Sequence, residues 1–248
     1  MEKRLILREL LKHRYAHRGL HEKPLIPENS MAAFARAVEA DYGIELDLHL
    51  TRDGKLAVIH DASLKRTCGA DRKIEELTLA EAQTYPLEES DERIPEFRDL
   101  LQLAAGKVPL IVELKAENRN EKALTDAAMK ELARYDGLYC VESFSPAAVA
   151  YLRKAYPQVV RGQLAGALNK KKKTISTLQD ILLRNLIVNL AGKPDFVAYQ
   201  FEDRKEPAFR RFRGAKFLWT IRSLEDLKTC EAWGAAPIFE RFDPRDDT

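Results

Sequence analysis

The feature that most constrains the fold is the alternation of short apolar segments with amphipathic ones along most of the 248 residues. The apolar segments have the length and composition of strands, and helical patterns separate most of them. Repeated strand–helix units favour a parallel sheet, and about eight of them predict a closed (β/α)₈ TIM barrel. An open doubly wound sheet is the alternative. The predicted strands are 15–17, 44–50, 56–60, 109–115, 138–144, 159–164, 196–201, 216–221 and 237–239.

Capping residues support the helices between these strands. Ser145 and Pro146 start a helix that Pro157 stops, and Asn29 or Ser30 caps an earlier one that ends before Gly43. The predicted helices include 31–38, 146–156, 203–212 and 223–233.

One polar, turn-rich segment at 61–96 interrupts the alternation. It is expected to hold a single short helix at 78–85, because Thr78 and Glu81 form a capping box. We interpret the segment as a small insertion between the second and third strand–helix units. The whole chain, 1–248, is then expected to be a single barrel domain.

The charge balance gives no reason to expect a nucleic-acid partner. The chain has 41 basic and 39 acidic residues, a net charge of +2, whereas nucleic-acid binding proteins usually carry a basic patch. The lysine run at 170–173 is interpreted as a solvated helix entry, with weak peripheral contact to anionic lipid as the alternative. The pattern does not predict an oligomeric state.

Cysteine usage and the chain start favour a cytoplasmic location. The three cysteines are scattered, without metal-type spacing, and are expected to be free thiols. The first residues carry Arg8 and Glu9 among apolar side chains and lack a small-residue cleavage site, so we expect no signal peptide. No apolar run approaches the ~20 residues of a membrane-spanning helix.

The second predicted strand carries acidic side chains on one face. Side chains alternate along a strand, so Glu45, Asp47 and His49 share a face opposite the apolar residues between them. In a barrel the apolar set faces the helices, and the acidic set points inward. Buried charge is costly unless a cation or a partner compensates it.

The next inner strand repeats this pattern with Glu113 and Lys115. Glu45, Asp47 and Glu113 together would form an all-oxygen site, which suits a hard cation such as Mg²⁺ or Ca²⁺. A salt-bridge network of these carboxylates with Lys115 and Arg18 is an equally good interpretation of the alternation alone.

Two histidines lie where a predicted strand gives way to a loop. His17 ends the first strand, before Gly19, and His60 ends the segment 56–60. Barrel enzymes keep their chemistry at strand ends, so these two are candidates for catalysis. His13, His21 and His49 lack this combination of features and are not expected to act directly.

A series of short motifs, in order, resembles the glycerophosphodiester phosphodiesterase family. The resemblance is dense up to Lys115 and sparse afterwards. The matching motifs are His17-Arg-Gly, Pro27-Glu-Asn-Ser, Glu45-Leu-Asp, Thr51-Arg-Asp-Gly, His60-Asp, Arg66-Thr, Ile111-Val-Glu-Leu-Lys, Ser143-Phe and Trp219-Thr-Ile.

The resemblance implies a TIM-type barrel that hydrolyses glycerophosphodiesters to glycerol 3-phosphate and an alcohol with the help of a divalent cation. It also suggests the substrate's glycerol 2-hydroxyl as nucleophile, although the residues do not distinguish this from direct attack by water. The implied roles are general acid and base for His17 and His60, metal ligands for Glu45, Asp47 and Glu113, phosphate contacts for Arg18 and Lys115, an aromatic at the mouth for Trp219, and a supporting position beside the site for Glu28 and Asn29.

Two departures from the family pattern concern substrate choice. Arg222 stands where the family commonly has asparagine, and Phe239-Glu-Arg-Phe242 replaces its Thr-Asp-x-Pro. Cleavage of lysophospholipids, as in related lipid phosphodiesterases of the same barrel type, is a second hypothesis, which requires an apolar groove; a catalytically silent binder of phosphodiesters or metal is a third. The candidate groove residues are Phe144, Phe201, Phe239 and Phe242.

Overall fold

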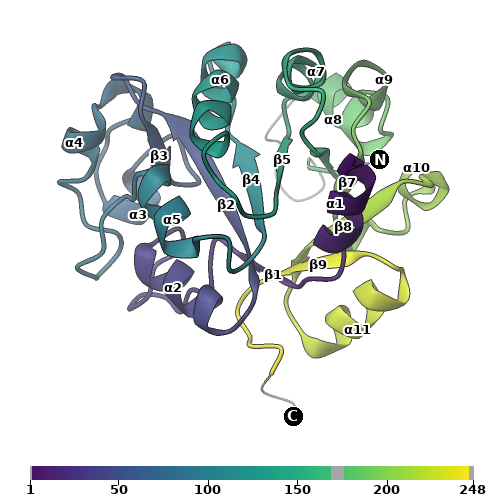
Figure 1. Cartoon of the computed structure of the whole chain (residues 1–248), viewed down its shortest axis with the longest axis horizontal. Helices are drawn as coiled ribbons and strands as arrows, with labels where there is room; N and C mark the ends of the chain where they lie inside the picture. Colours follow the sequence, from purple (N-terminus) through teal and green to yellow (C-terminus); the bar gives the residue numbers. More distant parts are fainter. Residues whose placement is uncertain (1, 169–175, 246–248) are drawn as a thin grey trace. The chain divides into compact units, whose positions relative to one another are not determined.

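The computed structural model describes residues 2–168 and 176–245 and consists of two compact units (Figure 1). The amino-terminal unit is Tyr15–Tyr139, and the carboxyl-terminal unit combines Met1–Arg14 with Cys140–Thr248. The lysine run at 170–173 lies outside the described residues, so its interpretation stays a prediction.

Three parallel strands form the sheet of the amino-terminal unit. Strand β2 pairs with β1 on one side, with Tyr15 opposite Gly43, and with β4 on the other, with Asp47 opposite Glu113. The elements of this unit are β1 (Tyr15–His17), α2 (Met31–Glu39), β2 (Gly43–Leu50), β3 (Leu56–Val58), α3 (Lys65–Cys68), η1 (Ile74–Glu76), α4 (Leu79–Ala82), α5 (Phe97–Ala104), β4 (Leu110–Leu114) and α6 (Glu121–Leu132).

Strand β3 runs antiparallel to β2 and forms a hairpin with it, which the alternation of parallel units does not predict. Leu50 faces Leu56, and Leu48 faces Val58. The Thr51 hydroxyl donates to the Asp53 carboxylate over 2.6 Å, and Gly54, at φ +74°, closes the turn. After the turn the chain therefore runs back beside β2, instead of leaving the sheet at the carboxyl end of β2.

The insertion at 61–96 follows β3 and precedes α5, and it has an apolar cluster of its own. It contains three short helical segments (α3, η1 and α4) where one was predicted. The capping box of Thr78 and Glu81 is confirmed at the start of α4. The extra segments place apolar side chains at this cluster: η1 buries Ile74, α4 buries Leu79 and Ala82, and the partly buried Cys68 of α3 packs against it. The buried members are Ala57, Ile59, Leu64, Ile74, Leu77, Leu79, Ala82, Leu87 and Ile94.

Five parallel strands, β5 to β9 in sequential pairing, form the sheet of the carboxyl-terminal unit. The parallel strands of the two units match the predicted strand–helix repeats. The elements here are α1 (Glu2–Leu10), β5 (Tyr139–Ser143), α7 (Pro146–Ala155), β6 (Arg161–Ala165), α8 (Thr177–Arg184), α9 (Asn189–Gly192), β7 (Phe196–Gln200), η2 (Phe201–Asp203), α10 (Pro207–Arg211), β8 (Ala215–Ile221), α11 (Leu224–Ala232) and β9 (Ala236–Phe239).

Helix starts follow the capping pattern closely. The hydroxyl groups of Ser30, Ser145 and Ser223 each accept a hydrogen bond from the backbone N–H of the third residue of the helix that follows, α2, α7 and α11 respectively. The segment 203–212 differs from the single helix predicted for it, since η2 ends at Asp203 and Pro207 begins a separate helix. Proline lacks an N–H donor, so it fits the first turn of a helix and interrupts a continuous one.

Aromatic side chains fill the core of the carboxyl-terminal unit. Phe196 packs on Phe217 with 4.7 Å between ring centroids. Phe209 stacks on Tyr199 at 4.6 Å and on Trp233 at 6.2 Å. Burial of such large rings stabilises this unit together with its buried aliphatic side chains.

Candidate active site

Strand β2 presents its acidic side chains inside the amino-terminal unit, as the alternation predicts. The exposed fractions of Glu45, Asp47 and His49 are 2%, 0% and 0%, and the apolar residues between them are buried on the opposite face. Asp47 lies opposite Glu113 in the pairing of β2 with β4. Both faces of β2 are therefore buried, and one of them carries ionisable side chains.

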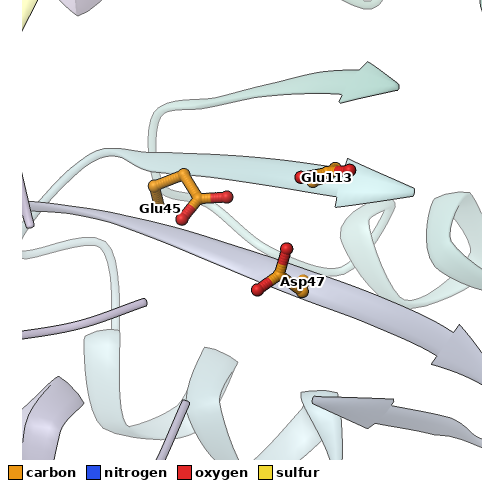
Figure 2. A group of neighbouring side chains, drawn as sticks. All are labelled: Glu45, Asp47 and Glu113. Atoms are coloured by element: carbon orange, nitrogen blue, oxygen red, sulfur yellow. The ribbon is translucent and has the colours of Figure 1, made fainter. Parts of the chain in front are cut away.

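Glu45, Asp47 and Glu113 converge on one point (Figure 2). Each offers one carboxylate oxygen, and these three oxygens lie within 4.8 Å of one another. Figure 2 shows Glu45 and Asp47 projecting from one strand and Glu113 from its neighbour. Parallel pairing of two strands with period-two alternation is what brings the three side chains to the same level.

Two cations contact this acidic cluster. The Lys115 ammonium lies 2.9 Å from Asp47 and 2.7 Å from Glu113, and the Arg18 Nε lies 3.4 Å from Asp47. The ion-pair network considered as the alternative to a metal site is thus present. With all three carboxylates of the cluster ionised, the two contacting cations leave an excess of one negative charge.

The pKa values of Asp47 and Glu113, the paired carboxylates of the cluster, shift in opposite directions. Burial, together with the Asp47 carboxylate, raises the pKa of Glu113 even though Lys115 opposes the shift. Burial acts upward on Asp47 too, but Lys115, His60 and Arg18 hold its pKa well below the usual range. A further cation would stabilise the ionised form of Glu113 as well.

The residues present fit a hard divalent cation. The donor set consists of carboxylate oxygens alone, is buried, and carries surplus negative charge, which suits Mg²⁺ or Ca²⁺. Glu45, Asp47 and Glu113 are the residues that would hold it.

Asn29 contacts this cluster directly, Glu28 is linked to it through Arg18, and the next residue, Ser30, caps the following helix. The Asn29 amide donates to Asp47 over 2.8 Å, while Ser30 caps α2. Glu28 accepts from the Arg18 guanidinium at 2.7 Å. Burial raises the pKa of Glu28, but Arg66, Arg18 and Lys23 outweigh this effect and lower it overall.

His17 lies at the end of β1, beside the cluster. Its Nε2 is 3.8 Å from the Glu45 carboxylate, and the backbone N–H of Arg18 donates to the same carboxylate over 3.0 Å. Gly19 makes a sharp turn just after β1, and its N–H donates to the Ala16 carbonyl over 3.2 Å. Its φ is +79°, and a Cβ there would meet Ala33 at 2.9 Å.

His60 reaches the cluster by a route that differs from the predicted one. It follows the antiparallel strand β3, so the hairpin carries it back beside β2, where the Ile59 N–H donates to the Asp47 carbonyl over 3.1 Å. His60 acts electrostatically on both Asp47 and Glu113. The hairpin, rather than the carboxyl end of a parallel strand, brings it to the site.

Two residues beside His60 were missed by the sequence reasoning. The Asp61 carboxylate lies 2.5 Å from His60 Nδ1, and the buried His49 ring lies 3.1 Å from the His60 carbonyl oxygen through its Nε2. The His-Asp pair in the sequence was a usable signal for Asp61. Burial lowers the pKa of His49 to about 4, so its ring is neutral near pH 7 and donates this hydrogen bond.

Trp219 and the phenylalanines of the predicted groove belong to the carboxyl-terminal unit. Phe144 meets Trp219 edge-on at 5.7 Å, and Phe239 meets Phe242 at 5.6 Å. Phe201 and Phe239 are buried, which leaves Phe144 and Phe242 as the partly exposed rings of the set. The predicted role of Trp219 stays a prediction.

Other expectations concern the chain as a whole. Cys68, Cys140 and Cys230 are free thiols, as predicted. Among the described residues, no helix is long and apolar enough to cross a membrane. The cytoplasmic location and the single-domain organisation stay predictions.

Comparison with known proteins supports the resemblance. Residues 17–240 match the Glycerophosphoryl diester phosphodiesterase family. A glycerophosphodiester phosphodiesterase of Caldanaerobacter subterraneus is 32% identical over 160 residues, which cover 60% of this chain and 65% of that relative. The match thus spans less than two thirds of that relative's length. A human lysophospholipase D is 34% identical over 124 residues, covering 45% of this chain and 38% of that protein.

A solved structure extends the likeness to almost the whole chain. An Oleispira antarctica phosphodiesterase, in complex with the product sn-glycerol-3-phosphate, has a TM-score of 0.77 at 20% identity and covers 94% of both chains. The predicted (β/α)₈ barrel class of fold is thereby confirmed over the open doubly wound alternative.

Proposed function

Because the chain belongs to the Glycerophosphoryl diester phosphodiesterase family, we propose that it hydrolyses glycerophosphodiesters to glycerol 3-phosphate and an alcohol. The observation that carries the proposal is the convergence of Glu45, Asp47 and Glu113 within 4.8 Å, beside His17. The product named for the Oleispira phosphodiesterase supports the substrate class.

Charge neutralisation is the first task of the site. A phosphodiester carries negative charge, which grows on the equatorial oxygens as the bond to the leaving alkoxide breaks. Arg18 and Lys115 are the protein cations that bind these oxygens in our proposal. A bound Mg²⁺ or Ca²⁺, held by the three carboxylates, would supply Lewis-acid stabilisation of the same charge.

Proton transfer is the second task, and we assign it to His17 and His60. One imidazole removes the proton of the attacking hydroxyl group, and the other protonates the departing alcohol oxygen. The nucleophile is either the substrate's glycerol 2-hydroxyl, with water then opening a cyclic phosphate, or water directly. Both routes consume one water molecule and give the same products.

A substrate panel with controlled metal content tests the function. We expect purified protein to release glycerol 3-phosphate from glycerophosphocholine, glycerophosphoethanolamine or glycerophosphoglycerol in Mg²⁺ or Ca²⁺. A chelator should abolish the release, and one cation added back singly should restore it. Absence of glycerol 3-phosphate from all three substrates would refute the proposal, and full activity in chelator would refute the role of the cation.

Cleavage of lysophospholipids on the headgroup side is the second candidate, favoured by the likeness to lysophospholipases D. It requires an apolar groove, for which Phe144 and Phe242 are the partly exposed candidates. Rates on lysophosphatidylcholine and glycerophosphocholine should be compared directly. Equal or faster turnover of the lipid would reverse our preference.

A catalytically silent binder is the third candidate. It is disfavoured because every matched acid–base and ligand position retains its residue. Stoichiometric binding of glycerophosphocholine without turnover under any metal condition would support it.

A further inference from the structure

Arg66, in the insertion, contacts two carboxylates at once. Its Nε donates to Asp61 over 2.6 Å, and its Nη2 donates to Glu28 over 2.6 Å. Burial opposes protonation of Arg66, but these two partners raise its pKa above the ordinary value, so the guanidinium is charged throughout. Neither the acid–base roles nor the phosphate contacts implied by the family resemblance include this residue.

Each of the two carboxylates also holds a side chain of the proposed site. The other Asp61 oxygen lies 2.5 Å from His60 Nδ1, and the same Glu28 oxygen accepts from the Arg18 guanidinium over 2.7 Å. A continuous chain of charged contacts thus runs from the imidazole through Arg66 to the phosphate-binding arginine.

We propose that Arg66 is a positioning residue, which holds Asp61 against His60 and Glu28 against Arg18 so that both site residues keep fixed orientations toward one phosphate. This inference rests on the proposed function. The insertion therefore contributes to catalysis through a residue that need not touch the substrate.

The physical basis is the geometry of the hydrogen bonds. A carboxylate that accepts from Nδ1 fixes the tautomer and the ring orientation of a histidine, and leaves Nε2 for proton transfer. A carboxylate held on one side alone is free to rotate away. The planar guanidinium, with donors in a rigid fork, anchors two carboxylates at once, whereas the single ammonium of a lysine does not reproduce this fork.

Lys23 differs from Arg66 in its second partner. It also pairs with Glu28, but its second partner is Glu88, at 2.8 Å. Its removal would weaken the hold on Glu28 without a direct effect on Asp61.

Kinetics of Arg66→Met and Arg66→Lys, with Arg52→Met as matched control, test the proposal. Arg52 also anchors the insertion, through Glu81 and the Glu76 carbonyl, but it does not belong to the chain of contacts above. We expect Arg66→Met to lower kcat about 10- to 100-fold with KM changed less than about 3-fold. Arg66→Lys should recover only a small part, and Arg52→Met should stay within about 2-fold of the wild type.

The leaving group distinguishes an action through His60 from general damage. Turnover of glycerophosphocholine should be compared with that of a 4-nitrophenyl glycerophosphodiester, whose leaving group needs little protonation. For each variant, the fold-loss of turnover with glycerophosphocholine is divided by the fold-loss with the nitrophenyl substrate. This ratio should be the same in Arg66→Met as in His60→Ala. A ratio that departs from that of His60→Ala, or a KM raised 10-fold at unchanged kcat, would overturn the positioning role.

A measurement without substrate separates this inference from the proposed function. In protein labelled with ¹⁵N-histidine, the Nδ1–H signal of His60, identified by its loss in His60→Ala, should be shifted downfield by the bond to Asp61. It should move or broaden in Arg66→Met and stay in place in Arg52→Met. An unchanged signal in Arg66→Met refutes the positioning role, whereas an inactive wild type with the expected signals refutes only the proposed function.

Discussion

The two units bury different chemistry. The amino-terminal unit encloses carboxylates and their cations, with Asp47 at 0% exposure, and the carboxyl-terminal unit encloses stacked aromatic rings such as Phe209. Buried charge is stable only when it is paired, so the first unit holds fixed ion pairs beside its apolar core. The second gains stability from packing. A substitution at the proposed site in the first unit should therefore reduce turnover more than stability. A substitution among the stacked rings of the second unit should reduce stability more than turnover.

His60→Ala should have the largest effect, and it should fall on turnover alone. Loss of a general acid or base costs about 10²- to 10⁴-fold in rate. The imidazole is partly exposed, so the free energy of unfolding should change by less than about 1 kcal/mol. Steady-state kinetics and thermal unfolding of the same preparation measure both quantities, with His13→Ala as control. Activity within 10-fold of the wild type would show that His60 is not an acid–base residue.

Phe209→Ala should show the reverse signature. Its ring is fully buried between Tyr199 and Trp233, so truncation should cost about 3–5 kcal/mol of unfolding free energy. The turnover number of the folded fraction at low temperature should stay within about 2-fold. Urea unfolding monitored by fluorescence, with Phe209→Leu as a milder control, tests this. A 10-fold loss of turnover in folded protein would break the contrast between the units.

Glu28→Gln tests whether the charge network also contributes stability. The pKa of Glu28 is lowered by Arg66, Arg18 and Lys23 against the effect of burial, so the folded state favours the carboxylate. This contribution is complete above the unfolded pKa of about 4.3 and is lost as the pH falls toward the folded value. We expect the variant to lose about 2 kcal/mol at pH 7.

The pH dependence of that loss is the sharper observation. As the pH falls from about 5 to 3, the wild type takes up a proton on unfolding that the glutamine variant does not. The stability difference between the two proteins should therefore shrink with acidification, as measured by urea unfolding at each pH. A difference that is constant over this range would mean that Glu28 is not stabilised as a carboxylate.

Thr78→Ala should have the smallest effect. The Thr78 hydroxyl accepts the Glu81 N–H over 3.2 Å in the capping box of α4, and its loss should cost about 1 kcal/mol. The consequence should be local, seen as faster proteolysis or hydrogen exchange within 61–96 at unchanged turnover. Thr78→Ser, which keeps the hydroxyl, is the control. A changed kcat would mean that loss of this cap also disturbs the part of the insertion that contacts the proposed site.

The sequence predicted the strands and the convergent carboxylates well, because both follow from local periodicity. Alternation along β2 and β4 is enough to place Asp47 and Glu113 on one face, and their register follows from parallel pairing. Serine caps likewise act within one helical turn, so Ser145 and Ser223 were predictable.

The route of His60 was not predictable in this way. Whether Leu56–Val58 pairs parallel or antiparallel depends on a five-residue turn, and a pattern of strand–helix units does not include hairpins. The contacts of Arg66 with Asp61 and Glu28 join residues up to 38 positions apart and depend on the path of the insertion. Long-range ion pairs leave no periodic signal in the chain.

The insertion begins and ends on the same short strand. It starts after His60, two residues beyond the end of β3, and its far end returns to β3, where Glu96 bridges to Ala57 and the Val58 N–H donates to the Pro95 carbonyl over 2.9 Å. Because both ends of the insertion are held beside β3, the stretch beyond Arg66 can change in length or sequence while the two ends keep their positions. Variation in this stretch would then leave the contacts of Asp61 with His60 and of Arg66 with Glu28 in place.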